Sequence, residues 1–209
     1  MLMMDLRLHG DKVMMVAGPS HGGKSTFVYN LLKRRHEFFR EYTNRVIWSY
    51  GIKQADLLEK LRVANFIGIE GIYPADQLRR HDILVLDDLL SESKNSKDVT
   101  NLFTRTAHHM HCFIIFITQN LFPSGKESRT RSLNTHYYAI FKNPRDQSQF
   151  EIFARQVAPR KSKALIEVFE KATQDPFQYL FIDFTQECAE NYRLRGKLLQ
   201  ERPDIYSLK

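Results

Sequence analysis

A glycine-rich segment near the N-terminus constrains this chain more than any other feature. Residues 18–25 read GPSHGGKS and match G-x-x-x-x-G-K-[ST] at every fixed position. An apolar run, residues 13–17, precedes the segment, and an amphipathic pattern follows Lys24. This order predicts a strand, a phosphate-binding loop (P-loop) and a helix, with backbone N–H groups facing an anion at the helix N-terminus. The segment therefore predicts a nucleoside triphosphate site.

Two residues of this loop have defined chemical roles. Lys24 is expected to reach the β- and γ-phosphates as a catalytic residue, and the Ser25 hydroxyl is expected to be a Mg²⁺ ligand. ATP and Mg²⁺ are therefore the predicted cofactors. The predicted nucleotide-binding residues are Gly18, Pro19, Ser20, His21, Gly22, Gly23, Lys24, Ser25 and Thr26.

A second motif places two acids directly after an apolar run. Residues 83–86 read ILVL and are followed by Asp87 and Asp88. In P-loop proteins the first acid at such a strand end orients the Mg²⁺ shell, so Asp87 is the predicted metal residue. Asp88 is then placed to polarise an attacking water as a general base, although acids also end strands in ordinary polar turns. The pair favours hydrolysis over simple nucleotide binding.

A third motif is an apolar run, residues 113–117, that finishes in Thr118, Gln119 and Asn120. In P-loop ATPases with an extra strand between the P-loop strand and the acid strand, a polar residue at this end senses the γ-phosphate and helps to hold the water. Gln119 is the predicted catalytic residue, with the other two beside it. Trp48 and Tyr50, near the end of another apolar run, are expected in the core, with stacking on a base as the alternative.

Strand-like runs alternate with helical patterns along all 209 residues, which predicts an α/β fold with a mostly parallel sheet between helices. We expect one domain, residues 1–209, in which 185–209 form a short C-terminal extension. The predicted strands are residues 12–17, 45–49, 83–86, 113–118, 137–141 and 179–184. We predict one helix directly after Lys24, two helices over residues 55–61 and 98–109, and a last helix around residues 165–172. Residues 91–97 and 122–132 are predicted loops.

Composition adds weaker constraints. The net charge of +7, from 31 Lys+Arg against 24 Asp+Glu, favours a polyanionic partner such as nucleic acid. Cys112 and Cys188 are too few for a disulfide framework or a thiolate zinc site, so buried thiols are expected. The longest apolar run, residues 113–117, is far shorter than a bilayer span, and the first residues lack a signal-peptide pattern. An intracellular, soluble protein without a membrane partner is therefore expected.

The order of the three motifs resembles the FtsK–HerA superfamily of motor ATPases. More specifically, the chain is similar to viral genome-packaging ATPases of poxvirus type, found in large DNA viruses and in Polinton and adintovirus-like elements. Residues 132–146, SLNTHYYAIFKNPRD, with FARQ at 153–156, look like the specific run of the Polinton and adintovirus members. Further similar segments are residues 48–51 with Gln54, 178–183 and 193–195, so the resemblance extends from about Lys12 to Tyr206.

This resemblance implies a P-loop NTPase fold of the RecA/ASCE-like type and a homo-oligomeric ring. The ring would hydrolyse ATP to move double-stranded DNA of any sequence into a capsid, with capsid or portal proteins as partners. The expected location is the virus assembly site in an infected cell, with association with the virion as a further expectation. Such rings complete each site with an arginine from the neighbouring subunit. Arg129, Arg131 and Arg145 are the candidates, and Arg131 is favoured.

Two other functions share the fold. One is a P-loop kinase that acts on a nucleoside or another small molecule. The other is a non-hydrolysing, nucleotide-switched adaptor associated with DNA. Turnover and the geometry of the site separate these alternatives from the motor, because the fold alone does not.

Overall fold

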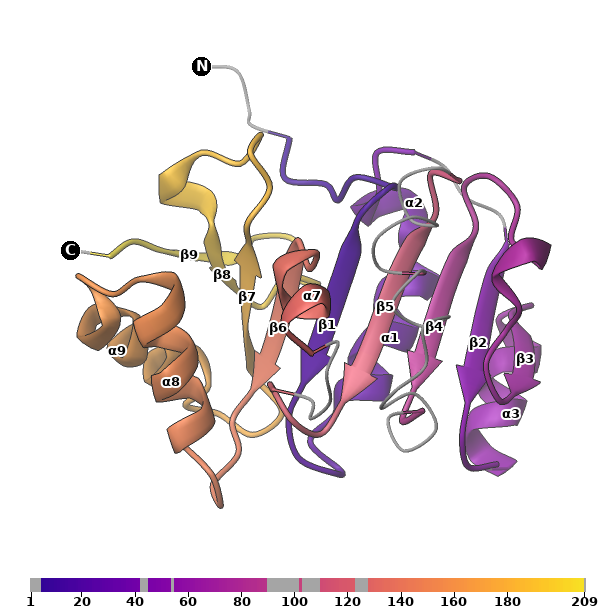
Figure 1. The fold of residues 1–209 in the computed structure, drawn as a ribbon, viewed down its shortest axis with the longest axis horizontal. Coiled ribbons are helices and arrows are strands. Elements are labelled where there is room, and N and C mark those ends of the chain that lie inside the picture. The colour runs from indigo at the N-terminus through magenta and orange to yellow at the C-terminus, as the bar shows by residue number, and fades with distance from the viewer. Residues whose placement is uncertain are drawn as a thin grey trace.

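A single nine-stranded sheet forms the centre of the part of the chain that the computed structural model describes, residues 5–41, 45–53, 55–89, 102, 110–122 and 128–208 (Figure 1). The strand order is β3-β2-β4-β5-β1-β6-β7-β8-β9. The strands are β1 (Val13–Ala17), β2 (Val46–Tyr50), β3 (Ile67–Glu70), β4 (Ile83–Asp87), β5 (Phe113–Thr118), β6 (Tyr137–Phe141), β7 (Tyr179–Asp183), β8 (Leu194–Gly196) and β9 (Asp204–Tyr206). The helices are α1 (Lys24–Lys33), α2 (Arg35–Phe38), α3 (Ala55–Val63), α7 (Ser128–Leu133), α8 (Ser148–Val157) and α9 (Ser162–Ala172), with short 3-10 turns at η1 (Ala75–Gln77) and η3 (Glu190–Tyr192).

The strands from β3 to β6 run parallel, and β5 lies between the P-loop strand β1 and the acid strand β4. Ala17 pairs with Thr118, and Asp87 pairs with Ile117, so the three motif-bearing strands end in register. Their carboxyl ends point to the lower edge of the sheet in Figure 1. This edge is where ligands bind in open α/β sheets, and here the three motifs meet.

The remaining strands run antiparallel, from β6 through β7 and β8 to β9. The C-terminal segment thereby continues the sheet, because β8 and β9 both lie within residues 185–209. A buried ion pair fastens β8 to β7: Arg195 donates to Asp183 at 2.9 Å, and their side chains are 2% and 8% exposed. Arg195 also donates to the carbonyls of Tyr192 and Leu6, which satisfies a cation that is removed from water.

Successive residues of the central strands pack on opposite faces of the sheet, and helices cover both. On one face Met14 and Val16 contact the apolar side of α1, and on the other Met15 contributes to the cluster that includes α8 and α9. Phe150 and Phe169 join α8 to α9, with their rings stacked at 3.7 Å. The helices form because their apolar residues recur at helical spacing and share one face.

The predicted α/β fold is confirmed, and the six predicted strands are found with ends shifted by no more than one residue. Three strands were not predicted: β3, at an edge with Ile67 41% exposed, and the three-residue strands β8 and β9. The predicted loop 122–132 is wrong in part, because residues 128–133 form α7. The predicted loop 91–97 and helix 98–109 lie, apart from residue 102, outside the described residues. Both cysteines are buried as expected.

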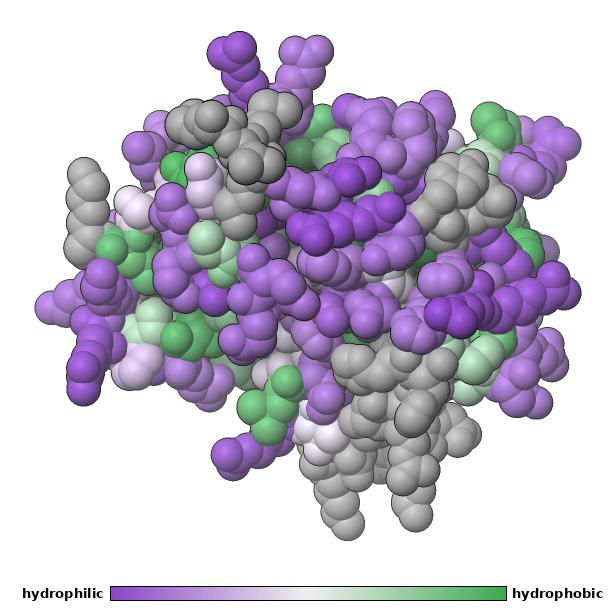
Figure 2. Space-filling view, turned by 90° about the horizontal axis from the view of Figure 1, so that it is seen from above, coloured by the Kyte–Doolittle hydropathy of each residue, from purple (hydrophilic) through white to green (hydrophobic). Residues whose placement is uncertain are grey.

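Hydrophilic residues dominate the face of the molecule that Figure 2 shows. Seen from above the view of Figure 1, hydrophilic side chains cover most of the face, and hydrophobic ones form small separate groups between them (Figure 2). Within the described ranges, every helix is too short or too polar to cross a bilayer.

Candidate functional site

The P-loop leaves β1 through a glycine that no other residue can replace. A Cβ at Gly18 would lie 2.6 Å from the Cβ of Phe141 on the neighbouring strand β6. Gly22 then donates its N–H to the Pro19 carbonyl at 3.1 Å, and Gly23, with φ of 93°, starts α1. This curl turns successive backbone N–H groups toward the N-terminus of α1, where the helix dipole favours an anion.

Lys24 is held inside the loop. Its side chain is 8% exposed, and its ammonium donates to the Pro19 carbonyl at 2.7 Å. Burial lowers the pKa of Lys24, while the carboxylates of Asp87 and Asp88 act in the opposite direction. A cation that is removed from water and held by a neutral carbonyl gains strongly from an incoming phosphate.

Asp87 and Ser25 lie together as expected for a Mg²⁺ site. The Ser25 hydroxyl donates to Oδ2 of Asp87 at 3.1 Å, and burial raises the pKa of this carboxyl. A carboxylate and a hydroxyl beside a phosphate site fit Mg²⁺, which prefers oxygen ligands shared with substrate phosphates. Ser25 and Asp87 would hold the ion, whose positive charge would also relieve the burial of the carboxylate.

Trp48 has a role that the sequence did not predict. It is fully buried, and its indole Nε1–H donates to the same oxygen of Asp87 at 3.1 Å. The expected core position is therefore correct, and the alternative of base stacking is wrong because the ring is inaccessible. The indole N–H therefore helps to orient the Asp87 carboxylate. The sequence alone could not predict this contact, because it depends on the pairing of β2 with β4.

Asp88 and Gln119 face each other across the mouth of the site. Nε2 of Gln119 lies 3.4 Å from both carboxylate oxygens of Asp88, and both side chains are exposed. Asp88 has a left-handed backbone with φ of 54°, which turns it away from the line of β4. Gly51 leaves room for this turn, because a Cβ there would lie 3.2 Å from the Asp88 carbonyl oxygen. The amide of Gln119 and the carboxylate of Asp88 together present a donor and an acceptor at the mouth of the site, and a water that binds beside them can be oriented by both.

These groups line one cavity of about 850 Å³. Seven of the nine predicted nucleotide-binding residues, 20–26, line it; the exceptions are Gly18 and Pro19. Asp87, Asp88 and Gln119 lie at its polar end, and the lining also includes Phe177, Tyr179 and Leu199. None of these last three residues was predicted, because they come from the antiparallel part of the sheet and have no motif around them.

The turn after Gln119 is held by α8. Gln149 accepts from the Leu121 backbone N–H at 2.8 Å and donates to Asp146 at 2.6 Å and to the Asn120 side chain at 3.4 Å. Hydrogen bonds from Ser148 and Gln149 lower the pKa of Asp146. The carboxyl end of β5 is thereby tied to the FKNPRD segment, which the resemblance singled out.

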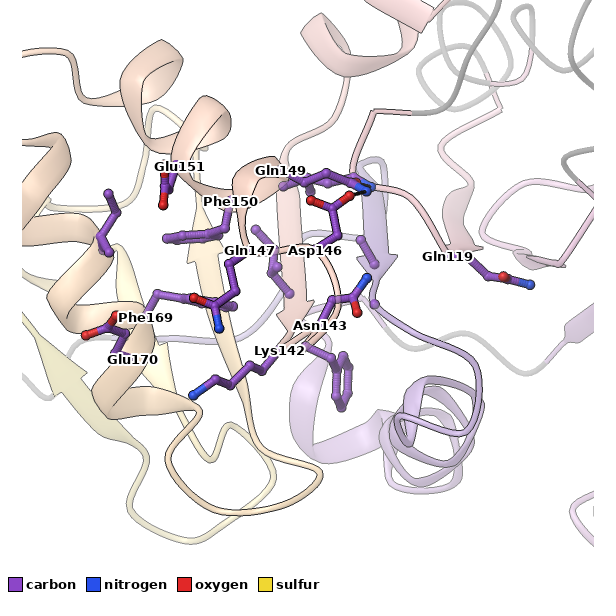
Figure 3. Close-up of a pocket in the computed structure, with 16 residues that line it drawn as sticks. Gln119, Lys142, Asn143, Asp146, Gln147, Gln149, Phe150, Glu151, Phe169 and Glu170 are labelled. Atoms are coloured by element: carbon purple, nitrogen blue, oxygen red, sulfur yellow. Dashed lines mark hydrogen bonds between the residues drawn. The ribbon is translucent and has the colours of Figure 1, made fainter.

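This segment lines a second, smaller cavity of about 100 Å³ between the end of β6 and helices α8 and α9 (Figure 3). Lys142 and Asn143 extend from the end of β6, the stacked Phe150 and Phe169 lie farther from the site, and Gln119 lies apart at the end of β5 (Figure 3). The cavity is on the α8–α9 face, opposite to the side of the sheet that α1 covers.

The expectation for Arg131 needs correction. Its side chain is 1% exposed, within α7, and it is absent from the lining of both cavities. An arginine that completes a neighbouring subunit's site must extend from the surface, so a side chain enclosed in its own subunit does not fit that role. Arg129 and Arg145 are exposed.

Comparison with known proteins supports the fold. No protein-family model and no curated protein matches the sequence. Among solved structures, the chain is similar to B204, the DNA-packaging ATPase of Sulfolobus turreted icosahedral virus, with a TM-score of 0.59 and 9% identity over 87% of this chain and 96% of that one. It is also similar to the genome-packaging NTPase B204 of Sulfolobus turreted icosahedral virus 2 in complex with ATPγS, with a TM-score of 0.56 and 11% identity over the same shares of the two chains. The resemblance to packaging ATPases is thus confirmed at the level of the fold, which is that of a P-loop NTPase.

Proposed function

We propose that this chain is an ATP-hydrolysing motor that moves double-stranded DNA into a capsid. The observation that carries the proposal is the pair of Asp88 and Gln119 across the mouth of the P-loop cavity, with Nε2 of Gln119 3.4 Å from both carboxylate oxygens. A kinase transfers its phosphoryl group to an acceptor hydroxyl and gains nothing from a pair that orients water. The geometry therefore favours hydrolysis.

Each residue of the site has one task in this reaction. The P-loop N–H groups and Lys24 hold the phosphates, and Lys24 stabilises the charge that develops on the transferred group. Ser25 and Asp87 would hold Mg²⁺, which would neutralise phosphate charge. Gln119 orients the attacking water, and Asp88 accepts its proton as the water oxygen bonds to the γ-phosphorus and the bond to the bridging oxygen of the leaving ADP breaks.

DNA as the partner is supported by charge and by the proteins that share the fold. A net charge of +7 suits a polyanion, and a motor must contact the phosphate backbone because it has to pass over any sequence. Two proteins with this fold are described as genome-packaging NTPases, and this chain covers 96% of each. The proposal extends to a homo-oligomeric ring that docks on capsid or portal proteins at the site of virus assembly.

An arginine from the neighbouring subunit belongs to this proposal, with Arg129 and Arg145 as candidates because both are exposed. Mixing subunits tests it. If Arg145→Ala and Lys24→Ala are each inactive, a mixture should regain part of the activity, because some sites then pair an intact P-loop with an intact arginine. An arginine that acts within its own subunit gives no such recovery, and the same mixture with Arg129→Ala compares the two candidates.

The experiment that tests the function is ATP hydrolysis with and without long double-stranded DNA, with Asp88→Asn in parallel. Strong stimulation by DNA that the substitution removes supports the motor and the base together. ATP binding with background turnover, even on DNA, would contradict the motor and favour the adaptor. Phosphorylation of an added nucleoside without DNA would favour the kinase.

A further inference from the structure

The nucleotide cavity has a second end that the hydrolytic groups do not use. Asp88 and Gln119 follow β4 and β5, whereas Tyr179 opens β7 and Phe177 lies two residues before it. In the sheet, β5 lies on one side of the P-loop strand β1, and β6 and β7 lie on the other. A triphosphate whose terminal phosphate faces Asp88 and Gln119 therefore directs its nucleoside toward the β7 side.

Phe177 occupies this side with an exposed ring. Its side chain is 69% exposed, which is unusual for a phenylalanine, and its backbone is left-handed with φ of 63°. The ring lies against the P-loop, because a Cβ at Gly23 would be 3.4 Å from its Cδ1. Exposure and a strained backbone both carry a free-energy cost, and a ligand that covers the ring recovers the cost of exposure.

The surface beside Phe177 offers few free polar groups. The Tyr179 hydroxyl is buried beside the backbone N–H groups of Leu198 and Leu199, which oppose the rise that burial causes in its pKa, and the ring of Tyr179 packs on Phe27 at 4.4 Å. The Leu199 carbonyl accepts from Arg34 at 2.7 Å. These partners occupy the polar atoms that would otherwise read the edge of a base, and mainly ring and aliphatic surface is left.

We propose that Phe177 stacks on the base of the bound nucleotide, and that the site therefore discriminates little between adenine and guanine. The proposal rests on the proposed function as a nucleoside triphosphatase. Stacking accepts any base because every base has a π-face, whereas discrimination requires hydrogen bonds to its edge. Among the described residues of the cavity wall outside the P-loop and the hydrolytic groups, Asn30 and Thr26 are the exposed polar side chains and lie on α1, whereas Thr118 and Tyr179 are buried.

Binding of nucleotides to the full chain tests this without DNA or turnover. Titration calorimetry should show that Phe177→Ala weakens ATP and GTP alike by about tenfold, the equivalent of about 1.4 kcal/mol of lost stacking. Phe177→Trp should restore binding. Inorganic tripolyphosphate, which has no base, should bind wild type and Phe177→Ala equally. Leu133→Ala, at a site 76% exposed in α7, is the matched control and should change none of these affinities.

Three results would overturn the proposal. ATP affinity unchanged in Phe177→Ala would exclude stacking, and an equal loss of tripolyphosphate affinity would mean that the ring supports the loop instead. A preference of wild type for ATP over GTP above about 30-fold would require edge recognition, since this exceeds about 2 kcal/mol. Failure of DNA to stimulate hydrolysis would contradict the motor while leaving these affinities unchanged, so the two proposals fail separately.

Discussion

The two ends of the nucleotide cavity are built from different parts of the sheet. The phosphate end takes Lys24, Asp87 and Gln119 from the carboxyl ends of neighbouring parallel strands, where charged and amide groups converge. The proposed nucleoside end takes Tyr179 from the start of the antiparallel strand β7 and Phe177 from just before it, where apolar surface dominates. The phosphate end has a chemistry that fixes its residue types, and the nucleoside end requires only a flat apolar surface.

This difference predicts whether a substitution in the cavity changes kcat or nucleotide affinity. Changes at the phosphate end should act mainly on kcat, because those groups meet charge that develops during the reaction. Changes at the nucleoside end should act on affinity, because stacking is equal in the ground state and the transition state.

Among the substitutions that leave the predicted Mg²⁺ ligands in place, Asp88→Asn should have the largest effect. It removes the proton acceptor while keeping the size of the side chain, so kcat for ATP should fall by about 10²–10⁴-fold. ATP affinity should stay within a few-fold of wild type, since Asp88 is exposed and is not expected to hold the phosphates. Steady-state hydrolysis with direct binding measurements separates the two. Full activity in the variant would remove Asp88 from the mechanism.

Gln119→Leu should cost about 10²-fold in kcat, the typical loss when one pre-organised polar group in a reaction site is removed. Gln147→Leu is a matched control, because Gln147 is also exposed and lines the second cavity but not the nucleotide cavity. Equal losses in the two variants would mean that the effect is structural.

The sequence predicted the phosphate end better than the nucleoside end for a physical reason. Asp88 and Gln119 follow apolar runs that end in register, so their meeting follows from parallel pairing alone. Trp48 could be assigned to Asp87 only once the order of β2 and β4 was known. Phe177 has no local pattern that distinguishes it from a residue of an ordinary turn. Local patterns thus reveal residues fixed by chemistry, and long-range packing decides the rest.

The preference for Arg131 failed for the same reason. Its position in a polar segment before β6 suggested exposure, but the segment forms α7 and the Arg131 side chain is buried, with 1% exposure. Arg129, two residues earlier, is exposed. Residues two apart on a helix point in different directions, and the charge pattern alone does not show which direction faces the core.

Trp48→Phe should change the pH dependence of activity. The indole N–H stabilises the charged form of Asp87 and so lowers its pKa, against the larger effect of burial, which raises it. Loss of this donor raises the pKa further, and a protonated carboxyl cannot hold Mg²⁺. The acid limb of kcat/KM should therefore move to higher pH, with about a tenfold loss at the acidic end and a smaller one at neutral pH. A uniform loss at every pH would contradict this account of Trp48.

Asp87→Asn should abolish Mg²⁺-dependent hydrolysis yet stabilise the ligand-free fold. Burial raises the Asp87 pKa, so at neutral pH the charged carboxylate destabilises the folded state. Asparagine removes the charge and keeps an oxygen that Ser25 and Trp48 can donate to. The melting temperature with chelator should rise by roughly 2–4 °C, which corresponds to about 1 kcal/mol in a chain of this size.

The sign of this effect can be checked with pH. The wild-type carboxyl takes up its proton as the pH falls through its raised pKa, and the destabilisation by its charge disappears there, so the advantage of the variant should shrink toward acidic pH. Mg²⁺ with ATP should reverse the order at neutral pH, because only wild type gains from the bound ion. A lower melting temperature of Asp87→Asn in chelator would mean that the carboxylate stabilises the empty site through its partners. The phosphate end would then already be organised before the nucleotide binds. The two ends of the cavity would differ only in the chemistry of their side chains.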